Sequence, residues 1–122
     1  MADTKIICHR GANKYAPQNT MPAFRKATEL GSEGFETDVH ITKDGTIVLC
    51  HNYTIDETSS GNGNISDMVL SQLKSYDFGS YFSNKFQGTQ IPTLDEFLDY
   101  VAQTDIKVLN IEIKSPKGKQ TA

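Results

Sequence analysis

Apolar residues gather in four short runs along the chain, and each run has the length of a β-strand. The predicted strands are Lys5–Cys8, Phe35–Ile41, Thr46–Cys50 and Lys107–Ile113. In the second and fourth runs polar residues alternate with apolar ones, which is typical of a strand with one buried face. The chain therefore offers strands that can share one sheet.

Other segments repeat apolar residues at helical spacing. One helix follows Thr20, a suitable N-cap, and ends near Gly31. Another follows a capping box formed by Thr93 and Glu96. A shorter helix is predicted over Ser66–Leu73. Helices placed between strands in this order favour an α/β fold with mostly parallel strands.

The connection between the second and third strands allows two arrangements. Asp44 and Gly45 are a strong turn signal, and a hairpin there makes the strands antiparallel and sets His51 opposite Asp38. Alternatively, residues Val39–Gly45 run back along the sheet, reach about 23 Å and allow parallel strands. Both arrangements bring His51 and Asp38 together.

Composition narrows the classes of function. The chain has 122 residues, enough for one domain, and a net charge of −3 argues against a nucleic-acid binder. No apolar run approaches the roughly 20 residues of a membrane span, and Ile6–Cys8 is too short for a signal-peptide core. Cys8 and Cys50 do not make a secreted disulfide framework. We therefore expect a cytoplasmic protein.

Two histidines follow apolar strands in matching settings. His9 comes directly after Cys8, and His51 comes directly after Cys50. The carboxyl ends of parallel strands are where α/β folds bind ligands, and a histidine there suits an acid or a base. A single histidine is more often a surface or core residue, but two in matching settings favour a functional site.

Carboxylates recur at the spacing that places them on one face of a strand. Glu36 and Asp38 are two residues apart, and Glu112 and Lys114 repeat the spacing on the fourth strand. Two partly buried carboxylates repel each other and lose hydration, and a divalent cation offsets both effects. Oxygen ligands favour Mg²⁺ or Ca²⁺ over zinc. The alternative for each pair is an ordinary solvated strand face.

Together these residues fit phosphodiester cleavage, for which cations neutralise the phosphate oxygens, a base activates the nucleophile and an acid protonates the leaving alkoxide. We expect the carboxylate strand to lie between the two histidine strands, which would then be about 10 Å apart. A phosphate flanked by an acid and a base fits that gap. The same spacing keeps Cys8 and Cys50 too far apart for a disulfide.

A series of short motifs covers nearly the whole chain in a fixed order. They are His9-Arg10-Gly11, Pro17-Gln18-Asn19-Thr20, Ala23-Phe24, Glu36-Thr37-Asp38-Val39, Thr42–Gly45, His51, Gly61-Asn62-Gly63, Asp77–Phe82, Ile91–Glu96 and Glu112-Ile113-Lys114. The series resembles the glycerophosphodiester phosphodiesterases, relatives of the phosphoinositide-specific phospholipases C. So many motifs in order make chance agreement an unlikely explanation.

The resemblance implies an enzyme that hydrolyses small-molecule glycerophosphodiesters to glycerol 3-phosphate and an alcohol with Mg²⁺ or Ca²⁺. A route through a cyclic phosphate, formed by the neighbouring glycerol hydroxyl, is a hypothesis for this reaction. The resemblance also implies an acid/base pair, three metal ligands and two phosphate-binding cations. The acid/base pair is His9 and His51, and the metal ligands are Glu36, Asp38 and Glu112. The phosphate-binding cations are Arg10 and Lys114.

Two positions depart from the family pattern. Gln18 stands where the family usually has Glu, and Asn52 stands where Asp commonly follows the second histidine. Each change removes a negative charge and keeps a side chain of similar shape. We expect reduced rather than abolished activity if the family's carboxylates orient Arg10 or raise the basicity of His51.

The family fold is a (β/α)₈ barrel, which needs about 250 residues. We therefore expect residues 1–122 to form the N-terminal part of an incomplete barrel, truncated after the fourth strand. Open edges and an uncovered apolar layer would favour a homodimer or pairing with a missing C-terminal half. The alternative function is an inactive fragment that binds a metal, a phosphate or a partner chain. A lipid-directed phospholipase is a third reading, unsupported by any amphipathic membrane-binding stretch.

Overall fold

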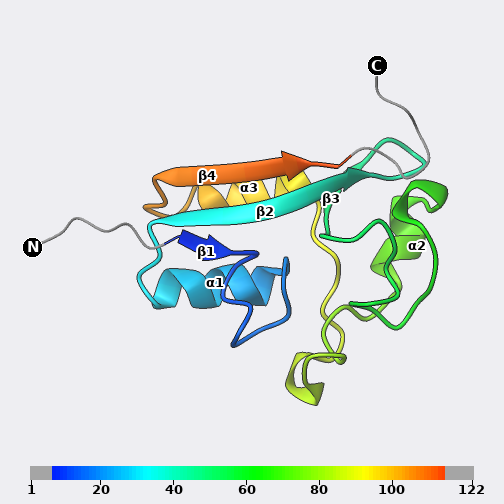
Figure 1. Ribbon diagram of the computed structural model, residues 1–122, viewed down its shortest axis with the longest axis horizontal. Helices are drawn as coiled ribbons and strands as arrows, with labels where there is room; N and C mark the ends of the chain where they lie inside the picture. Colours follow the sequence, from blue (N-terminus) through cyan, green and yellow to red (C-terminus); the bar gives the residue numbers. More distant parts are fainter. Residues whose placement is uncertain (1–6, 115–122) are drawn as a thin grey trace, which may run out of the picture.

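The structure is a computed structural model that describes residues 7–114. Figure 1 shows its elements in chain order. They are β1 (Ile7–His9), α1 (Met21–Glu29), β2 (Gly34–Ile41), β3 (Ile47–Leu49), the 3₁₀ turn η1 (Ile65–Asp67), α2 (Leu70–Lys74), the 3₁₀ turn η2 (Asn84–Phe86), α3 (Leu94–Val101) and β4 (Val108–Ile113). The predicted α/β order is confirmed. The first two residues of the strand predicted at Lys5–Cys8 lie outside the described residues.

Strand β2 is the centre of a four-stranded sheet. β1 and β4 pair with it in parallel, and β3 pairs with it antiparallel. Gly34 is paired with both β1 and β4, and Val39 is paired with both β3 and β4. Because a strand has only two edges, β1 and β3 must share one edge of β2 and β4 must occupy the other.

The shared edge changes the expected position of the histidine strands. β2 does pair with both of them, but it does not separate them: β1 and β3 follow each other along the same edge. The Arg10 backbone N–H donates to the Glu36 carbonyl oxygen at 2.7 Å, and the Cys50 N–H donates to the Asp38 carbonyl oxygen at 3.0 Å. The carboxyl ends of β1 and β3 therefore meet beside Glu36 and Asp38.

The connection between β2 and β3 is the hairpin, with a register one residue away from the prediction. Val39 lies opposite Leu49, so Cys50 rather than His51 comes opposite Asp38. The Asp44 carboxylate accepts hydrogen bonds from the Thr42 hydroxyl and from the Leu70 N–H that begins α2. The loop has three residues instead of two, because the Thr42 N–H donates to the Thr46 carbonyl oxygen at 2.8 Å and Gly45 adopts φ +83°.

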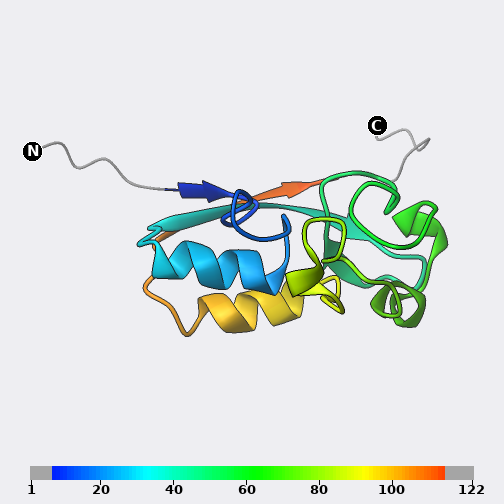
Figure 2. The same ribbon diagram turned by 90° about the horizontal axis from the view of Figure 1, so that it is seen from below.

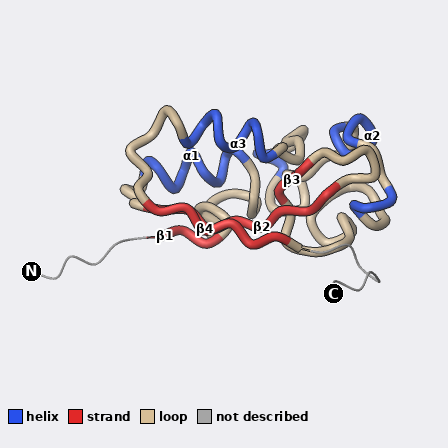
Figure 3. The backbone as a smooth tube through the Cα atoms, turned by 90° about the horizontal axis from the view of Figure 1, so that it is seen from above, coloured by secondary structure: helices blue, strands red, loops and turns tan. Residues whose placement is uncertain are grey.

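Helices α1 and α3 cover one face of the sheet (Figures 2 and 3). Between them and the sheet lies the first core, which contains Ala12, Phe24, Ala27, Phe35, Val39, Leu49 and Phe97. The ring centroids of Phe24 and Phe97 are 4.6 Å apart. The predicted capping box begins α3. The Thr20 hydroxyl instead donates to the Pro17 carbonyl oxygen at 2.6 Å and makes no cap bond to α1.

Residues between β3 and α3 form a second core beside the end of the sheet. Its buried members are Val48, Cys50, Ile55, Ile65, Met68, Leu73, Phe78 and Ile91. The helix predicted over Ser66–Leu73 is divided into η1 and α2, because Met68 is extended (φ −119°, ψ 145°) and inserts its side chain into this core. Within residues 7–114 no helix combines the length and apolarity needed to cross a membrane.

The packing predicts a large contrast between two neighbouring residues of α3. Phe97 is fully buried, whereas Leu98 is 38% exposed. Phe97→Ala should lower the free energy of unfolding by about 3–5 kcal/mol, because it removes buried surface and leaves a cavity. Leu98→Ala should lower it by about 1 kcal/mol or less. Urea titrations followed by circular dichroism measure both, and equal losses would contradict the described core.

Candidate active site

The three predicted metal-binding carboxylates lie together on the face of the sheet that α1 and α3 leave uncovered. Glu36 and Asp38 project from this face of β2, because alternate residues of a strand point the same way. Glu112 of β4 lies directly opposite Asp38 in the parallel register. One carboxylate oxygen from each residue lies within 4.8 Å of the others. The structure thus brings together residues 36, 38 and 112.

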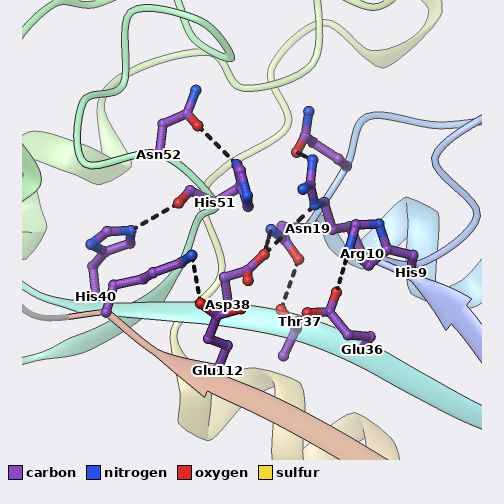
Figure 4. A network of polar contacts seen from close by, with 12 residues as sticks. His9, Arg10, Asn19, Glu36, Thr37, Asp38, His40, His51, Asn52 and Glu112 are labelled. Atoms are coloured by element: carbon purple, nitrogen blue, oxygen red, sulfur yellow. Dashed lines mark hydrogen bonds and ion pairs between the residues drawn. The ribbon is translucent and has the colours of Figure 1, made fainter.

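The predicted cations pair with these carboxylates (Figure 4). Arg10 Nε lies 3.7 Å from Asp38 Oδ2, and Lys114 Nζ lies 2.8 Å from Glu112 Oε2. Arg10 also donates from a guanidinium nitrogen to Gln18 Oε1 at 3.0 Å. The position that departs from the family pattern therefore contacts the arginine directly, through an amide oxygen instead of a carboxylate.

The two predicted histidines reach the site from the ends of β1 and β3. His9 Nε2 lies 3.2 Å from Glu36 Oε1, and the His9 side chain is 56% exposed. His51 Nδ1 lies 2.8 Å from Asn52 Oδ1. Because an amide oxygen only accepts hydrogen bonds, Nδ1 of His51 carries the proton in this pair and Nε2 is left as the basic nitrogen.

The site also contains three residues to which the sequence analysis assigned no role: Asn19, Thr37 and His40. His40 Nε2 donates to the His51 carbonyl oxygen at 3.3 Å, and its ring meets Tyr53 edge-on with centroids 5.1 Å apart. Asn19 and Thr37 hydrogen-bond to each other and, through Asn19, to Asp38. The alternation of β2 places His40 on the site face, so the strand pattern alone could have included it.

The charges of the site shift the ionisation of its members. Burial and the neighbouring Asp38 raise the pKa of Glu36 above its ordinary value of 4.5, although His9 opposes the shift. The hydrogen bond from Lys114 lowers the pKa of Glu112, and the same pair raises the pKa of Lys114. Burial lowers the pKa of His40, which favours the neutral ring.

The site suits a divalent cation. Glu36 Oε1 is buried and forms no hydrogen bond of good geometry among the described residues, despite its ion-pair distance to His9. A buried carboxylate oxygen without a hydrogen bond is unfavourable, and two carboxylates on one strand face repel each other. A hard cation bound by three carboxylates relieves both problems, and it requires only the oxygen ligands present.

Shallow depressions flank the carboxylates. One, of about 330 Å³, is lined by Glu36, Asn110, Ile111 and Glu112. Another, of about 280 Å³, is lined by residues 51–54, Glu57 and Lys114. A larger hollow of about 510 Å³ lies among residues of α1, α3 and the 87–92 segment, and contains none of the predicted site residues. The chemistry of the side chains, rather than the size of the hollow, therefore locates the site.

The fold is part of a (β/α)₈ barrel, an incomplete barrel whose sheet does not close among residues 7–114. A profile of the glycerophosphoryl diester phosphodiesterase family matches residues 9–121. The chain belongs to this family. The motif resemblance in the sequence and the predicted barrel class are thereby confirmed.

Individual relatives agree with this assignment. The chain is 46% identical over 112 residues to a glycerophosphodiester phosphodiesterase of Caldanaerobacter subterraneus, a match covering 92% of this chain and 46% of the relative. It aligns with the crystal structure of a glycerophosphodiester phosphodiesterase from Agrobacterium tumefaciens with a TM-score of 0.85 and 36% identity, covering 90% of this chain and 47% of that one.

A second solved structure carries a ligand. The structure of an Oleispira antarctica phosphodiesterase in complex with the product sn-glycerol-3-phosphate aligns with a TM-score of 0.89 and 34% identity, over 94% of this chain and 46% of that one. The chain thus spans about half the length of the relatives that it matches.

The raised pKa of Glu36 predicts how pH acts on the metal-free fold. A carboxyl whose pKa is higher when folded contributes stability that is present below about pH 4.5 and lost as pH rises through the folded pKa. Glu36→Gln, which cannot ionise, should therefore be more stable than the unchanged protein at neutral pH in EDTA. Thermal denaturation measures the difference.

A control variant and the addition of Mg²⁺ make the Glu36→Gln test specific. The exposed Glu29→Gln should show no comparable change, because its carboxylate is not buried. Added Mg²⁺ should stabilise the unchanged protein but not Glu36→Gln, since the ion needs the carboxylate. A Glu36→Gln variant that is less stable in EDTA at neutral pH would contradict the assigned repulsion.

Proposed function

We propose that this protein hydrolyses glycerophosphodiesters to glycerol 3-phosphate and an alcohol with the help of a divalent cation. The cluster of three carboxylates with two histidines and two cations on one sheet face carries the proposal. Family membership and the relative solved with sn-glycerol-3-phosphate support the same substrate class.

Glu36, Asp38 and Glu112 would hold the ion, Mg²⁺ or Ca²⁺, through carboxylate oxygens. When bound, the ion supplies positive charge that stabilises the phosphate oxygens as the P–O bond breaks. Arg10 and Lys114 lie beside the same carboxylates and add donors for those oxygens. Gln18 keeps the Arg10 guanidinium in one orientation through the contact to its amide oxygen.

The histidines would move the protons. In the cyclic route, the neighbouring glycerol hydroxyl attacks phosphorus and gives its proton to one histidine, while the other protonates the departing alkoxide. Water then opens the cyclic phosphate with the two roles exchanged. Nε2 of His51 is suited to this exchange because Asn52 occupies Nδ1. His9 is the more exposed partner and contacts Glu36.

The free thiols of Cys8 and Cys50 are consistent with the cytoplasm as the proposed location, because a reducing compartment keeps thiols unpaired.

The second candidate function is a module that binds a metal or a phosphate ligand without turnover, alone or paired with a second chain. The observation favouring it is the length of the chain, about half that of its relatives.

Hydrolysis of glycerophosphocholine distinguishes the two candidates. With Mg²⁺ or Ca²⁺ the protein should release glycerol 3-phosphate, and EDTA should stop the release. His9→Ala and His51→Ala should each lower kcat by about 10²–10⁴-fold, the usual contribution of a general acid or base. The exposed Lys85→Ala should retain full activity. Metal binding without hydrolysis would support the binding module, and hydrolysis insensitive to EDTA would contradict the metal role.

The Asn52 departure makes a separate prediction. Asn52→Asp places a negative charge 2.8 Å from the position of His51 Nδ1 and should stabilise the protonated ring. We expect the acid limb of the pH–rate profile to move upward by about one pH unit or less, and kcat/KM to change by no more than about tenfold. Asn64→Asp, outside the site, is the control. An unchanged profile would show that residue 52 does not tune His51.

A further inference from the structure

Asn19 lies within the polar network of the site although the proposed chemistry assigns it no role (Figure 4). The residue is 3% exposed. Its backbone N–H donates to the Arg10 carbonyl oxygen at 2.9 Å. Its side chain donates from Nδ2 to Asp38 Oδ2 at 3.4 Å and accepts at Oδ1 from the Thr37 hydroxyl at 2.7 Å. The side chain thus uses its donor and its acceptor on two neighbouring residues of β2.

Those two neighbours belong to opposite faces of the sheet. Asp38 points to the uncovered face, whereas Thr37, fully buried, lies between Phe35 and Val39 in the alternation that faces the helices. Asn19 can reach both because it lies at the shared edge of β2, where the carboxyl ends of β1 and β3 meet. The amide therefore links the core side of the sheet to the carboxylate cluster.

Chemistry determines which way the amide faces. An ionised carboxylate only accepts hydrogen bonds, so the N–H₂ group must face Asp38 and the amide oxygen must face Thr37. The Thr37 hydroxyl can donate to that oxygen and hold the amide in this orientation. The bond to Oδ2 then restricts rotation of the Asp38 carboxylate beside Glu36 and Glu112.

From this arrangement we propose that Thr37 and Asn19 are positioning residues that together set the orientation of Asp38 for the divalent cation. The inference rests on the proposed function, and it concerns residues that do not touch the substrate. Thr37 acts from the core through the amide of Asn19, and Asn19 acts on the carboxylate. Replacing a group that orients a metal ligand in this way typically lowers metal affinity by about 10–100-fold.

The backbone suggests a competing explanation. Asn19 has φ +56° and Arg10 has φ +55°, a region in which asparagine is tolerated better than most residues. Asn19 could then be present only for its backbone conformation. Glycine adopts the same conformation without strain, so Asn19→Gly keeps the turn and removes only the amide. Under the competing explanation this variant would behave like the unchanged protein.

The test measures Mn²⁺ affinity by calorimetry together with kcat/KM for glycerophosphocholine. Thr37→Val removes the hydroxyl at nearly constant volume and should weaken Mn²⁺ binding by about 10-fold, and Asn19→Gly should weaken it by about 10–100-fold. Thr37→Ser keeps the donor and should stay within about twofold of the unchanged protein. Thermal denaturation of all three shows that the fold is retained.

Each outcome either supports or overturns the positioning role of Thr37 and Asn19. Loss of Mn²⁺ affinity in Thr37→Val and Asn19→Gly, with rescue in Thr37→Ser, supports the positioning role. Unchanged affinity in a folded Asn19→Gly protein overturns it, even if Thr37→Val fails to fold. If the unchanged protein hydrolyses the diester and Asn19→Gly matches it, only this inference fails. If the unchanged protein neither binds Mn²⁺ nor hydrolyses the diester, the proposed function fails with it.

Discussion

The burial of one carboxylate is the constraint on which the site depends. Asp38 is 1% exposed, and Glu36 on the same strand face and Glu112 directly opposite add further negative charge. Burying a charge is strongly unfavourable unless it is paired and hydrogen-bonded. Arg10 and Asn19 supply part of that compensation, at 3.7 and 3.4 Å. A divalent cation would supply the rest, so the same repulsion that weakens the metal-free site would favour binding of an ion.

The pairing of β2 explains how distant parts of the chain meet at this carboxylate. β1 and β3 share one edge of β2, so the backbone N–H groups of Arg10 and Cys50 reach the carbonyl oxygens of Glu36 and Asp38, two residues apart on the strand. β3 and the residue after it also join the two cores. Leu49 belongs to the first core, between the sheet and the helices, while Val48 and Cys50 belong to the second core. The position of His51 therefore depends on both cores. His9, at the exposed end of a three-residue strand, depends chiefly on β1.

The features that the sequence predicts best depend on residues only two or three positions apart. Glu36 and Asp38 share a face because they are two residues apart on a strand, and the capping box of α3 follows from Thr93 and Glu96 alone. The hairpin register could not be predicted, since Asp44-Gly45 suits a two-residue turn as well as the three-residue loop observed, in which Gly45 has φ +83°. The common edge of β1 and β3 is a matter of tertiary pairing. The link from Thr37 through Asn19 to Asp38 requires a positive φ and a gap between strands, neither of which leaves a pattern in the sequence.

The most direct test of the central claim is the position of a bound ion. A crystal of the protein soaked in Mn²⁺ and sn-glycerol 3-phosphate, measured for anomalous scattering, should show one strong peak between Glu36, Asp38 and Glu112. The phosphate should lie against this ion, Arg10 and Lys114. A structure in which the ligand is bound but Mn²⁺ lies elsewhere, with the His9–Glu36 and Lys114–Glu112 pairs intact, would contradict the account.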